Sequence, residues 1–182
     1  MQAYSDQEIQ SLTQKWVEKI VIGLNLCPFA KAVYVKKQIR YSICHATTVD
    51  ELCLFLNDEL NNLIETDAAI TDTTLIIHPF VLLDFLDFND FLDVADEILE
   101  MASLEDEIQI ASFHPQYQFS GTEPNDIENY TNRSPFPILQ LLREKSVEKA
   151  VAAFPDAHDI FNKNIKTMKS LGHQGWDELN KD

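Results

Sequence analysis

Apolar side chains recur at helical spacing in three stretches of the chain. At the first of them, Ser5 and Glu8 form the pair typical of a helix N-terminus, and Gly23 follows the last apolar position. Apolar residues three to four positions apart predict an amphipathic helix with one face toward the core. The predicted helices cover residues 6–22, about 48–65 and about 88–102, and the first carries its apolar positions at Ile9, Leu12, Trp16 and Ile20.

Three shorter stretches have the pattern of β-strands. Residues 38–45 (QIRYSICH) alternate apolar and polar positions, 74–80 (TLIIHPF) form a continuous apolar run suited to a buried strand, and 108–113 (IQIASF) follow as a third. Because these strands alternate with the predicted helices, the pattern favours an α/β fold. We expect a single domain over residues 1–182, with a small, at least partly parallel sheet of about three or more strands flanked by helices.

The last third of the chain is predicted to be mostly helical. A Ser-Pro pair is typical of an N-cap followed by the first helical position, and glycine is typical of a helix end. One helix is therefore expected to begin at Ser134 and Pro135 and run to about residue 153, with a break allowed near Ser146, and another to begin at Pro155 and Asp156 and end at Gly172. The residues after it, about 173–182, are expected to form a polar tail.

Residues 113–137 separate the third predicted strand from the next predicted helix and have almost no periodicity. Irregular loops of this length are uncommon in compact domains and are usually functional or disordered. Aromatic side chains would pin this loop to the body of the protein, so we expect it to be ordered and to line a site. These aromatic residues are Phe113, Tyr117, Phe119, Tyr130 and Phe136.

Arg133 stands just before the expected helix N-terminus, with Asn132 beside it. A guanidinium next to unpaired backbone N–H groups is suited to binding an anion, so Arg133, Asn132 and Tyr117 are candidate ligand-binding residues. The alternative is structural. In that case Arg133 pairs with a surface carboxylate, and asparagines such as Asn125 and Asn129 satisfy turn geometry.

Each predicted strand is followed by, or ends in, a histidine: His45, His78 and His114. In open α/β sheets ligands bind outside the carboxyl ends of the strands, so mutually parallel strands would bring these side chains to one edge. Proline follows both His78 and His114 and would rigidify those turns. A neutral imidazole can be a general base or a metal ligand, although a half-exposed histidine bonded to a nearby carbonyl remains the alternative for each.

Residues 25–31 (NLCPFAK) contain the cysteine with the clearest route to reactivity. If Pro28 opens a short helix, Cys27 is its N-cap, and unpaired N–H groups with the helix dipole would lower the pKa of the thiol. A buried structural cysteine is the alternative for Cys27, and Cys44 and Cys53 are expected to serve packing. The CPFA turn resembles that of glutaredoxins and omega-class glutathione transferases, but here a helix rather than a strand precedes it.

The formal net charge is −16, from 14 Lys plus Arg and 30 Asp plus Glu. Such a surface repels phosphate backbones and anionic lipids, so neither nucleic acid nor a membrane is expected as a partner. The N-terminus has no basic segment leading into an apolar run, and three cysteines without a CxxC pair favour free thiols in a reducing compartment. A soluble cytoplasmic protein is the expectation.

Several long motifs together resemble an uncharacterised bacterial family, domain-of-unknown-function family 1415. They are NLCPFA, DFLDFNDFLDVAD, FHPQYQF, NYTNRSPFP, LLRE and LGHQGW, and they span nearly the full chain. The resemblance implies a cytoplasmic, single-domain bacterial protein and no particular reaction. Matching positions include Cys27, His78, His114, Tyr117, Asn132, Arg133, Arg143 and Glu144, of which the last two could form a structural ion pair.

Three functional hypotheses follow from these residues. In the first, the protein is an enzyme for a small anionic molecule, with Cys27 as nucleophile or redox thiol, His78 or His114 as base and Arg133 as anion clamp. In the second, His45, His78, His114 and Cys27 bind a metal or other ligand without catalysis. In the third, the DFLDFNDFLD segment docks a partner protein. The sequence identifies no cofactor, metal, substrate or oligomeric state.

Overall fold

The computed structural model describes residues 4–153, 159–179 and 181. Its centre is a four-stranded mixed sheet in the order β1-β2-β4-β3, in which β1 and β2 are parallel and β4 is antiparallel to both its neighbours. It follows that β1, β2 and β3 run in one direction and end at one edge, called here the carboxyl edge. The strands are β1 (Ile39–Ile43), β2 (Thr73–Ile77), β3 (Ile108–Phe113) and β4 (Ile138–Arg143).

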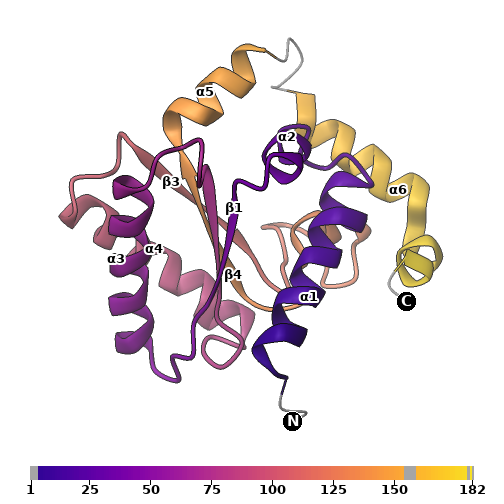
Figure 1. Cartoon of the computed structure of the whole chain (residues 1–182). Coiled ribbons are helices and arrows are strands. Elements are labelled where there is room, and N and C mark those ends of the chain that lie inside the picture. The colour runs from indigo at the N-terminus through magenta and orange to yellow at the C-terminus, as the bar shows by residue number, and fades with distance from the viewer. Residues whose placement is uncertain (1–3, 154–158, 180, 182) are drawn as a thin grey trace.

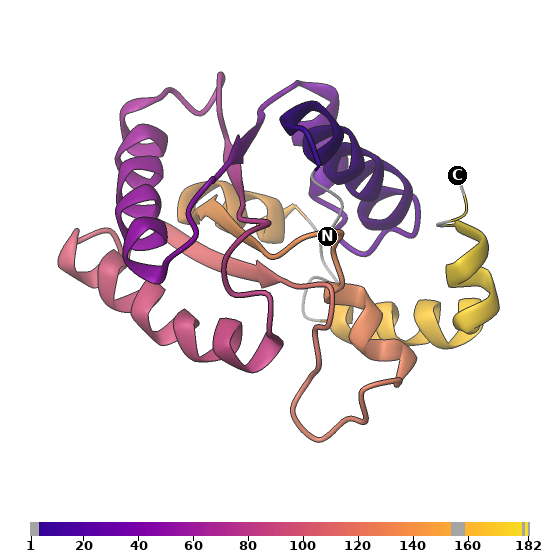
Figure 2. The ribbon, with the colours of Figure 1, turned by 90° about the horizontal axis from the view of Figure 1, so that it is seen from below.

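Helices cover both faces of the sheet, which confirms the expected α/β class (Figure 1). On one face lie α3 (Val49–Glu65) and α4 (Phe85–Met101), and on the other lie α1 (Asp6–Trp16), the π-helix η1 (Val17–Ile22) and α6 (Ile160–Leu179). The view from below shows the same two layers (Figure 2). The remaining elements are α2 (Ala30–Val35), the 3-10 helix η2 (Ile127–Asn132) and α5 (Glu144–Ala152).

Two hydrophobic clusters form the core, one on each face of the sheet. Every residue of β2 is buried, and successive side chains alternate between the clusters: Leu75 and Ile77 face α1, whereas Ile76 faces α3 and α4. A strand covered by helices on both faces has no polar side, which explains the continuous apolar run at this position. Among the described residues, no helix has both the length and the apolar composition to cross a bilayer.

The first predicted helix has the expected limits but changes type along its length. Ser5 caps α1 with a capping box to Glu8, and the helix switches at Val17 to the π-helix η1, which ends at Gly23. Glycine is required at that end, because a Cβ atom on Gly23 would lie 2.1 Å from the carbonyl oxygen of Lys19. The strands and the helices α3 and α4 lie within a few residues of their predicted limits.

The prediction of a helix from Ser134 to about residue 153 is wrong over its first half. Residues 138–143 form the central strand β4, and α5 starts only at Glu144 and continues past Ser146 without a break to Ala152. The hydroxyl of Ser134 donates to the carbonyl of Phe136 instead of capping a helix. A short apolar run such as ILQLLR suits a strand or a helix equally, so only its neighbours decide between them.

Arg143 closes β4 and stabilises the end of α3. Its guanidinium donates to the carbonyl oxygens of Leu63, Thr66 and Thr71, at distances down to 2.5 Å. These are carbonyl groups at and beyond the C-terminal end of α3, where a cation is favourable. The suggested ion pair with Glu144 is therefore not the role of Arg143 in this structure.

The C-terminal helix continues beyond its predicted end. Gly172 was predicted to end this helix. It has a φ of 65° and interrupts α6, but the chain then resumes a helical path to Leu179. Residues 173–179 are thus helical where a polar tail was expected, and Trp176 packs edge-on against Tyr130 with ring centroids 5.1 Å apart. The predicted start of this helix at Pro155 and Asp156 lies outside the described residues.

Candidate functional site

The three histidines predicted to follow strands lie at the carboxyl edge of the sheet. His45, His78 and His114 come directly after, or within two residues of, the ends of β1, β2 and β3, so their expected convergence on one edge is confirmed. His45 is exposed, stacks on Phe80 and has its Nε2 3.1 Å from a carboxylate oxygen of Asp6. The other two are fully buried on the α4 side of the sheet.

Both buried imidazoles are bonded to the backbone segment that follows β2. His78 donates from Nδ1 to the carbonyl of Val81 at 3.1 Å. His114 donates from Nε2 to the carbonyl of Leu82 at 3.2 Å, and its Nδ1 accepts from the backbone N–H of Gln116 at 3.0 Å. The carbonyl acceptors assign these tautomers. Two neighbouring carbonyls are thereby held in place, and Leu82 keeps a left-handed φ of 56°.

Burial keeps both imidazoles neutral near pH 7. It lowers the pKa of His78 to about 4, because an imidazolium loses its hydration there and repulsion from His114 adds to the effect. Burial is also the main cause that lowers the pKa of His114. Both ring nitrogens of His114 are occupied, whereas Nε2 of His78 is buried and has no hydrogen-bond partner among the described residues.

Cys27 lies in a bend before α2 and is not its N-cap. The helix begins at Ala30 with Phe29 as N-cap, so the prediction that Pro28 opens it is wrong. Backbone N–H groups of Phe29 and Ala30 do bond to the sulfur, but burial has the larger effect and raises the pKa of the thiol. The predicted lowering of this pKa is therefore wrong in sign.

Cys27 and the histidines lie at opposite ends of the sheet. α1 begins with Asp6 beside His45 at the carboxyl edge, and α1 and η1 together run 17 residues away from it. At about 1.5 Å per residue these helices span roughly 25 Å. The segment containing Cys27 then connects η1 to α2, which leads into the amino end of β1 (Figure 1). No single site combines Cys27 with His78 or His114 in this arrangement.

The metal hypothesis requires His45, His78, His114 and Cys27 to lie close together, and the distance between Cys27 and the histidines argues against it. Within residues 4–153, 159–179 and 181, no group of three or more His, Cys, Asp or Glu side chains is arranged to hold a metal ion. That ligand set is therefore not assembled.

Arg133 is bonded to the loop that it closes. Its Nε donates to the carbonyl of Tyr117 at 3.4 Å and its Nη2 to the carbonyl of Pro124 at 2.5 Å. The guanidinium carbon also lies 3.9 Å from the ring centroid of Tyr130, a cation–π contact. Among the described residues Arg133 forms no ion pair, and no helix begins behind it, so neither expected arrangement is found.

Two asparagines order the rest of the loop. The side chain of Asn132 donates to the carbonyl of Ser112, and its own backbone carbonyl accepts from the N–H of His114 at 3.2 Å. Asn129 is fully buried, and its side chain makes three hydrogen bonds within the loop, to Phe119, Thr122 and Glu123. These contacts confirm the expectation of an ordered loop, and they support the structural interpretation of its asparagines.

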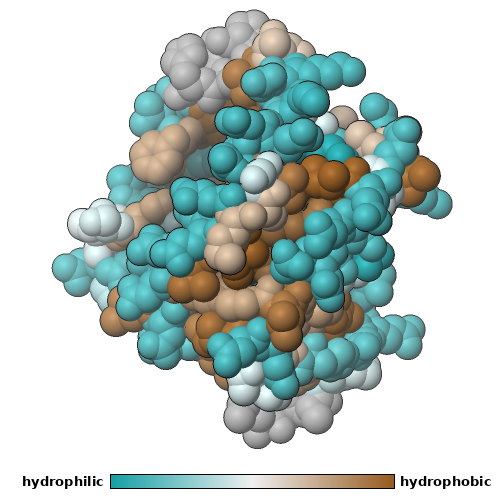
Figure 3. Space-filling view, turned by 90° about the vertical axis from the view of Figure 1, so that its left-hand side faces the viewer, coloured by the Kyte–Doolittle hydropathy of each residue, from teal (hydrophilic) through white to brown (hydrophobic). Residues whose placement is uncertain are grey.

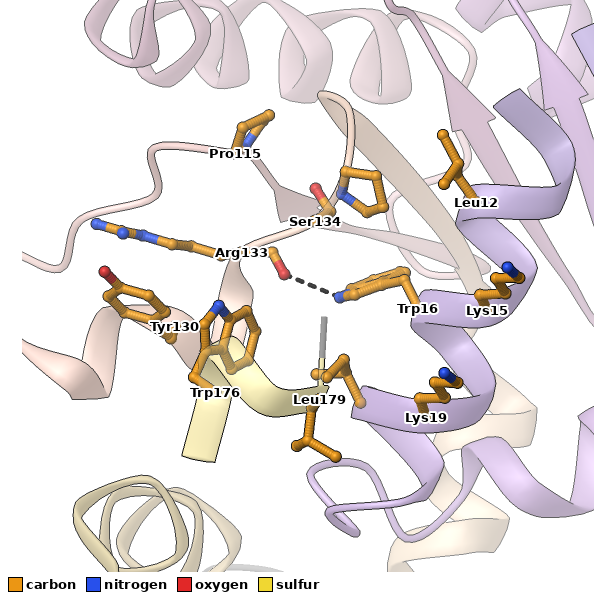
Figure 4. Close-up of a pocket in the computed structure, with 12 residues that line it drawn as sticks. Leu12, Lys15, Trp16, Lys19, Pro115, Tyr130, Arg133, Ser134, Trp176 and Leu179 are labelled. Carbon is orange, nitrogen blue, oxygen red and sulfur yellow. Dashed lines mark hydrogen bonds between the residues drawn. The ribbon is translucent and has the colours of Figure 1, made fainter. Parts of the chain in front are cut away.

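A pocket of about 340 Å³ lies where this loop meets α1, η1 and the end of α6 (Figure 4). Its base is the indole of Trp16, which is almost fully buried and donates from Nε1 to the carbonyl oxygen of Arg133 at 2.8 Å. Figure 4 shows Lys15 and Lys19 on one side of this indole and the rings of Tyr130 and Trp176 on the other. The lining residues are Leu12, Lys15, Trp16, Lys19, Ile20, Pro115, Tyr130, Arg133, Ser134, Pro135, Trp176 and Leu179.

The lining is aromatic and positively charged. It includes Lys15, Lys19 and Arg133 and contains no Asp or Glu. Neither lysine forms an ion pair within the part of the chain that the structure describes, and both are exposed. The guanidinium of Arg133 points away from Trp16 and over Tyr130, so it contributes charge at the rim rather than a free donor at the base (Figure 4).

The charge of the whole chain is distributed unevenly around this pocket. Between Arg40 and Arg133 there are 20 Asp and Glu residues and no Lys or Arg, so all 14 basic residues lie in the two flanking segments, 1–40 and 133–182. These flanking segments supply α1, η1, α5 and α6. The pocket thus lies on the basic part of an acidic molecule.

Residues expected to bind a ligand only partly coincide with this pocket. Arg133 lines it, but Asn132 and Tyr117 do not, and the ring of Tyr117 packs instead against Phe85 of α4. Trp16 with Lys15 and Lys19 on either side of it in the sequence was not among the predicted binding residues. Two lysines four positions apart on one predicted helix of such an acidic chain would have indicated an anion-binding site.

The family model described as "Protein of unknown function (DUF1415)" matches residues 8–178 of the chain. This match covers both sides of the pocket and agrees with the resemblance drawn from the motifs. Neither a curated protein nor a solved structure matches the chain.

Proposed function

The chain belongs to the DUF1415 family, and we propose that it binds a small organic anion with an aromatic body in the pocket between α1, the 113–137 loop and α6. The observation that carries the proposal is an aromatic, carboxylate-free lining with two exposed lysines, on a chain of net charge −16. Neither lysine forms an ion pair with any residue that the structure describes. The proposal keeps the anionic ligand expected from the sequence and assigns it largely different side chains.

The charge arrangement supports an anion rather than a neutral ligand. Lys15 and Lys19 are four positions apart, so their amino groups extend from the same side of the helix. Since the rest of the surface is mostly acidic, an anion is attracted here and repelled elsewhere. A phosphate or carboxylate at this rim would form charge-assisted hydrogen bonds with one or both amino groups.

The aromatic walls support a flat or apolar ligand body. Trp16, Tyr130 and Trp176 offer rings whose faces and edges favour stacked or edge-on contact with another ring. The pocket volume of about 340 Å³ lies in the range of small-molecule sites. The hydrogen bond from the indole N–H of Trp16 to the carbonyl of Arg133 joins two sides of the pocket that are 117 positions apart in the sequence.

The π-helix is a further reason to regard the pocket as functional. η1 contributes Lys19 and Ile20 to the lining and covers six residues. π-Helical turns are rare, and those that occur are frequently found at functional sites. Here the π-helix follows directly after Trp16 and alters the direction of the lining side chains relative to a continued α-helix.

An enzymatic role for Cys27, His78 and His114 stays a prediction. A thiol mechanism needs the base within hydrogen-bond reach of the sulfur, and the opposite positions of these groups in the sheet give it no support. A ligand-binding protein therefore agrees better with the geometry than a thiol-dependent enzyme does.

Tryptophan fluorescence offers a direct test, because both tryptophans of the chain line the pocket. The wild-type protein is titrated with an aryl phosphate, an aryl carboxylate, an aliphatic dicarboxylate, inorganic phosphate and a neutral aromatic alcohol. We expect saturable quenching by an aromatic anion, with weaker binding of the others. If none of the aromatic anions gives a saturable change, the proposal fails.

Two matched double variants separate a specific site from general charge. Lys15→Gln with Lys19→Gln is expected to weaken binding about tenfold, which corresponds to about 1.4 kcal/mol. Lys31→Gln with Lys36→Gln removes the same charge from the exposed surface around α2 and should leave the affinity within about twofold. Equal losses in both variants would indicate non-specific attraction and contradict the pocket.

A further inference from the structure

α4 has a buried face and an exposed face, and the exposed face is not purely polar. Phe88, Phe91, Ala95 and Leu99 form the buried face. On the opposite side, Leu86 is 70% exposed, Val94 37% and Met101 86%. These three lie eight and seven positions apart, about two helical turns or roughly 11 Å in each step, so they form one stripe along the helix.

Carboxylates separate the apolar side chains of this stripe. Asp90, Asp93, Glu97 and Glu100 stand on the same exposed side of α4, and none of them forms an ion pair within the described part of the chain. The neighbouring helix α3 also lacks Lys and Arg, because none occurs between Arg40 and Arg133. The positive charges that would neutralise these carboxylates are thus absent from both helices of this layer.

Figure 3 views the molecule from the side on which α3 and α4 lie, and it shows hydrophobic side chains gathered among hydrophilic ones. α3 adds Leu54, which is 70% exposed, to this surface. A contiguous group of exposed apolar side chains rimmed by charged residues is typical of an interaction site, since water contact with it is unfavourable. The DFLDFNDFLD segment was a candidate for docking a partner protein. Most of its phenylalanines are buried against the core, whereas Leu86 is exposed to solvent.

We infer that the exposed stripe of α4 (Leu86, Val94 and Met101 with the carboxylates between them) binds a cationic amphipathic helix of another polypeptide. Apolar residues two turns apart on α4 can pack against apolar residues at heptad spacing on a partner helix. Lys and Arg on the flanks of that helix would pair with Asp90, Asp93, Glu97 and Glu100. A second copy of this chain is a poorer occupant, because each copy carries a net charge of −16.

The test uses a fluorescent synthetic peptide of about three heptads, with leucine at the a and d positions and lysine on the flanks. A second peptide of identical composition has its leucines distributed around the helix. Fluorescence anisotropy is measured with the full-length protein at about 50 mM and about 300 mM salt, which changes the screening of exposed charges. We expect at least tenfold tighter binding of the amphipathic peptide and weaker binding at high salt.

Variants locate the contact. Leu86→Ser with Met101→Ser should weaken binding at least tenfold, whereas Val151→Ser with Phe161→Ser removes two similarly apolar surface residues elsewhere and should have no effect. Circular dichroism and the pocket titration check that each variant is folded. Equal affinity for the two peptides, or equal affinity of the stripe variant and the wild type, would overturn the inference. A concentration-dependent dimer that the stripe substitutions abolish would also overturn it, because the occupant would then be a second copy.

Discussion

The buried histidines His78 and His114 and the pocket lined by Trp16, Lys15 and Lys19 lie on opposite faces of the sheet and use their polar groups in opposite ways. His78 and His114 are buried and bond to backbone groups of their own fold. Lys15 and Lys19 are exposed and have no protein partner within the described residues. Strand-end histidines satisfied by carbonyls stabilise a loop, whereas unpaired charges beside an aromatic pocket are available to a ligand. Residue type alone does not distinguish these situations; the presence of a partner does.

The largest effect is expected for His114→Ala. It removes a buried ring and leaves the carbonyl of Leu82 and the N–H of Gln116 without their partner, so we expect unfolding free energy to fall by about 4 kcal/mol. Urea denaturation measures this change. His45→Ala, at an exposed ring, should cost less than about 0.5 kcal/mol. A similar small loss for His114→Ala would contradict its structural role.

Stability should also decrease with acid because of the buried histidine pair. The folded-state pKa of His78 is lowered to about 4, below the unfolded value, so the unfolded chain binds more protons between about pH 6.5 and pH 4. The stability that neutral, buried His78 contributes is fully present above about pH 6.5. As the pH falls toward 4, the free energy of unfolding decreases by up to about 3 kcal/mol from this side chain.

The measurement for this pH dependence is urea denaturation at a series of pH values for the wild type and for His78→Gln. The variant should show a shallower dependence on pH even if it is less stable at pH 7. Equal slopes for wild type and His78→Gln would remove His78 as the source.

A smaller effect, on binding rather than on folding, is expected for Trp176→Ala. This side chain is only partly buried and lines the pocket, so its loss should weaken the aromatic anion about tenfold, or by about 1.4 kcal/mol. Isothermal titration calorimetry reports the affinity without relying on the lost fluorophore. If stability falls strongly while affinity stays the same, Trp176 belongs with the histidines as a structural residue.

The smallest effect is expected for Cys27→Ser. Because burial raises the pKa of this thiol and it lies away from the pocket lining, ligand affinity should stay within about twofold of the wild type. Alkylation of Cys27 at pH 7 should be slower than that of a free model thiol, as measured by mass spectrometry over time. Rapid, selective alkylation would instead restore the thiol-dependent enzyme as a hypothesis.

Much of the fold was predictable because its signals are local. The capping box at Ser5 and Glu8, the buried run of β2 and the apolar periodicity of α3 and α4 each specify an element from adjacent residues. The order of strands and helices then placed three histidines at one edge. The prediction failed at residues 138–143, where a central strand and a buried helix have the same apolar composition and only pairing with β2 and β3 decides.

The sequence alone determined the α/β class, the ordered aromatic loop and the family, since periodicity, turn chemistry and long motifs act within short segments. Only the tertiary structure decided which polar groups have partners. Burial reversed the expected pKa shift of Cys27, backbone carbonyls engaged both buried histidines, and the pocket formed where Trp16 meets a carbonyl 117 positions away. Solvent exposure and contacts between distant segments set these outcomes, and neither is encoded in the spacing of neighbouring residues.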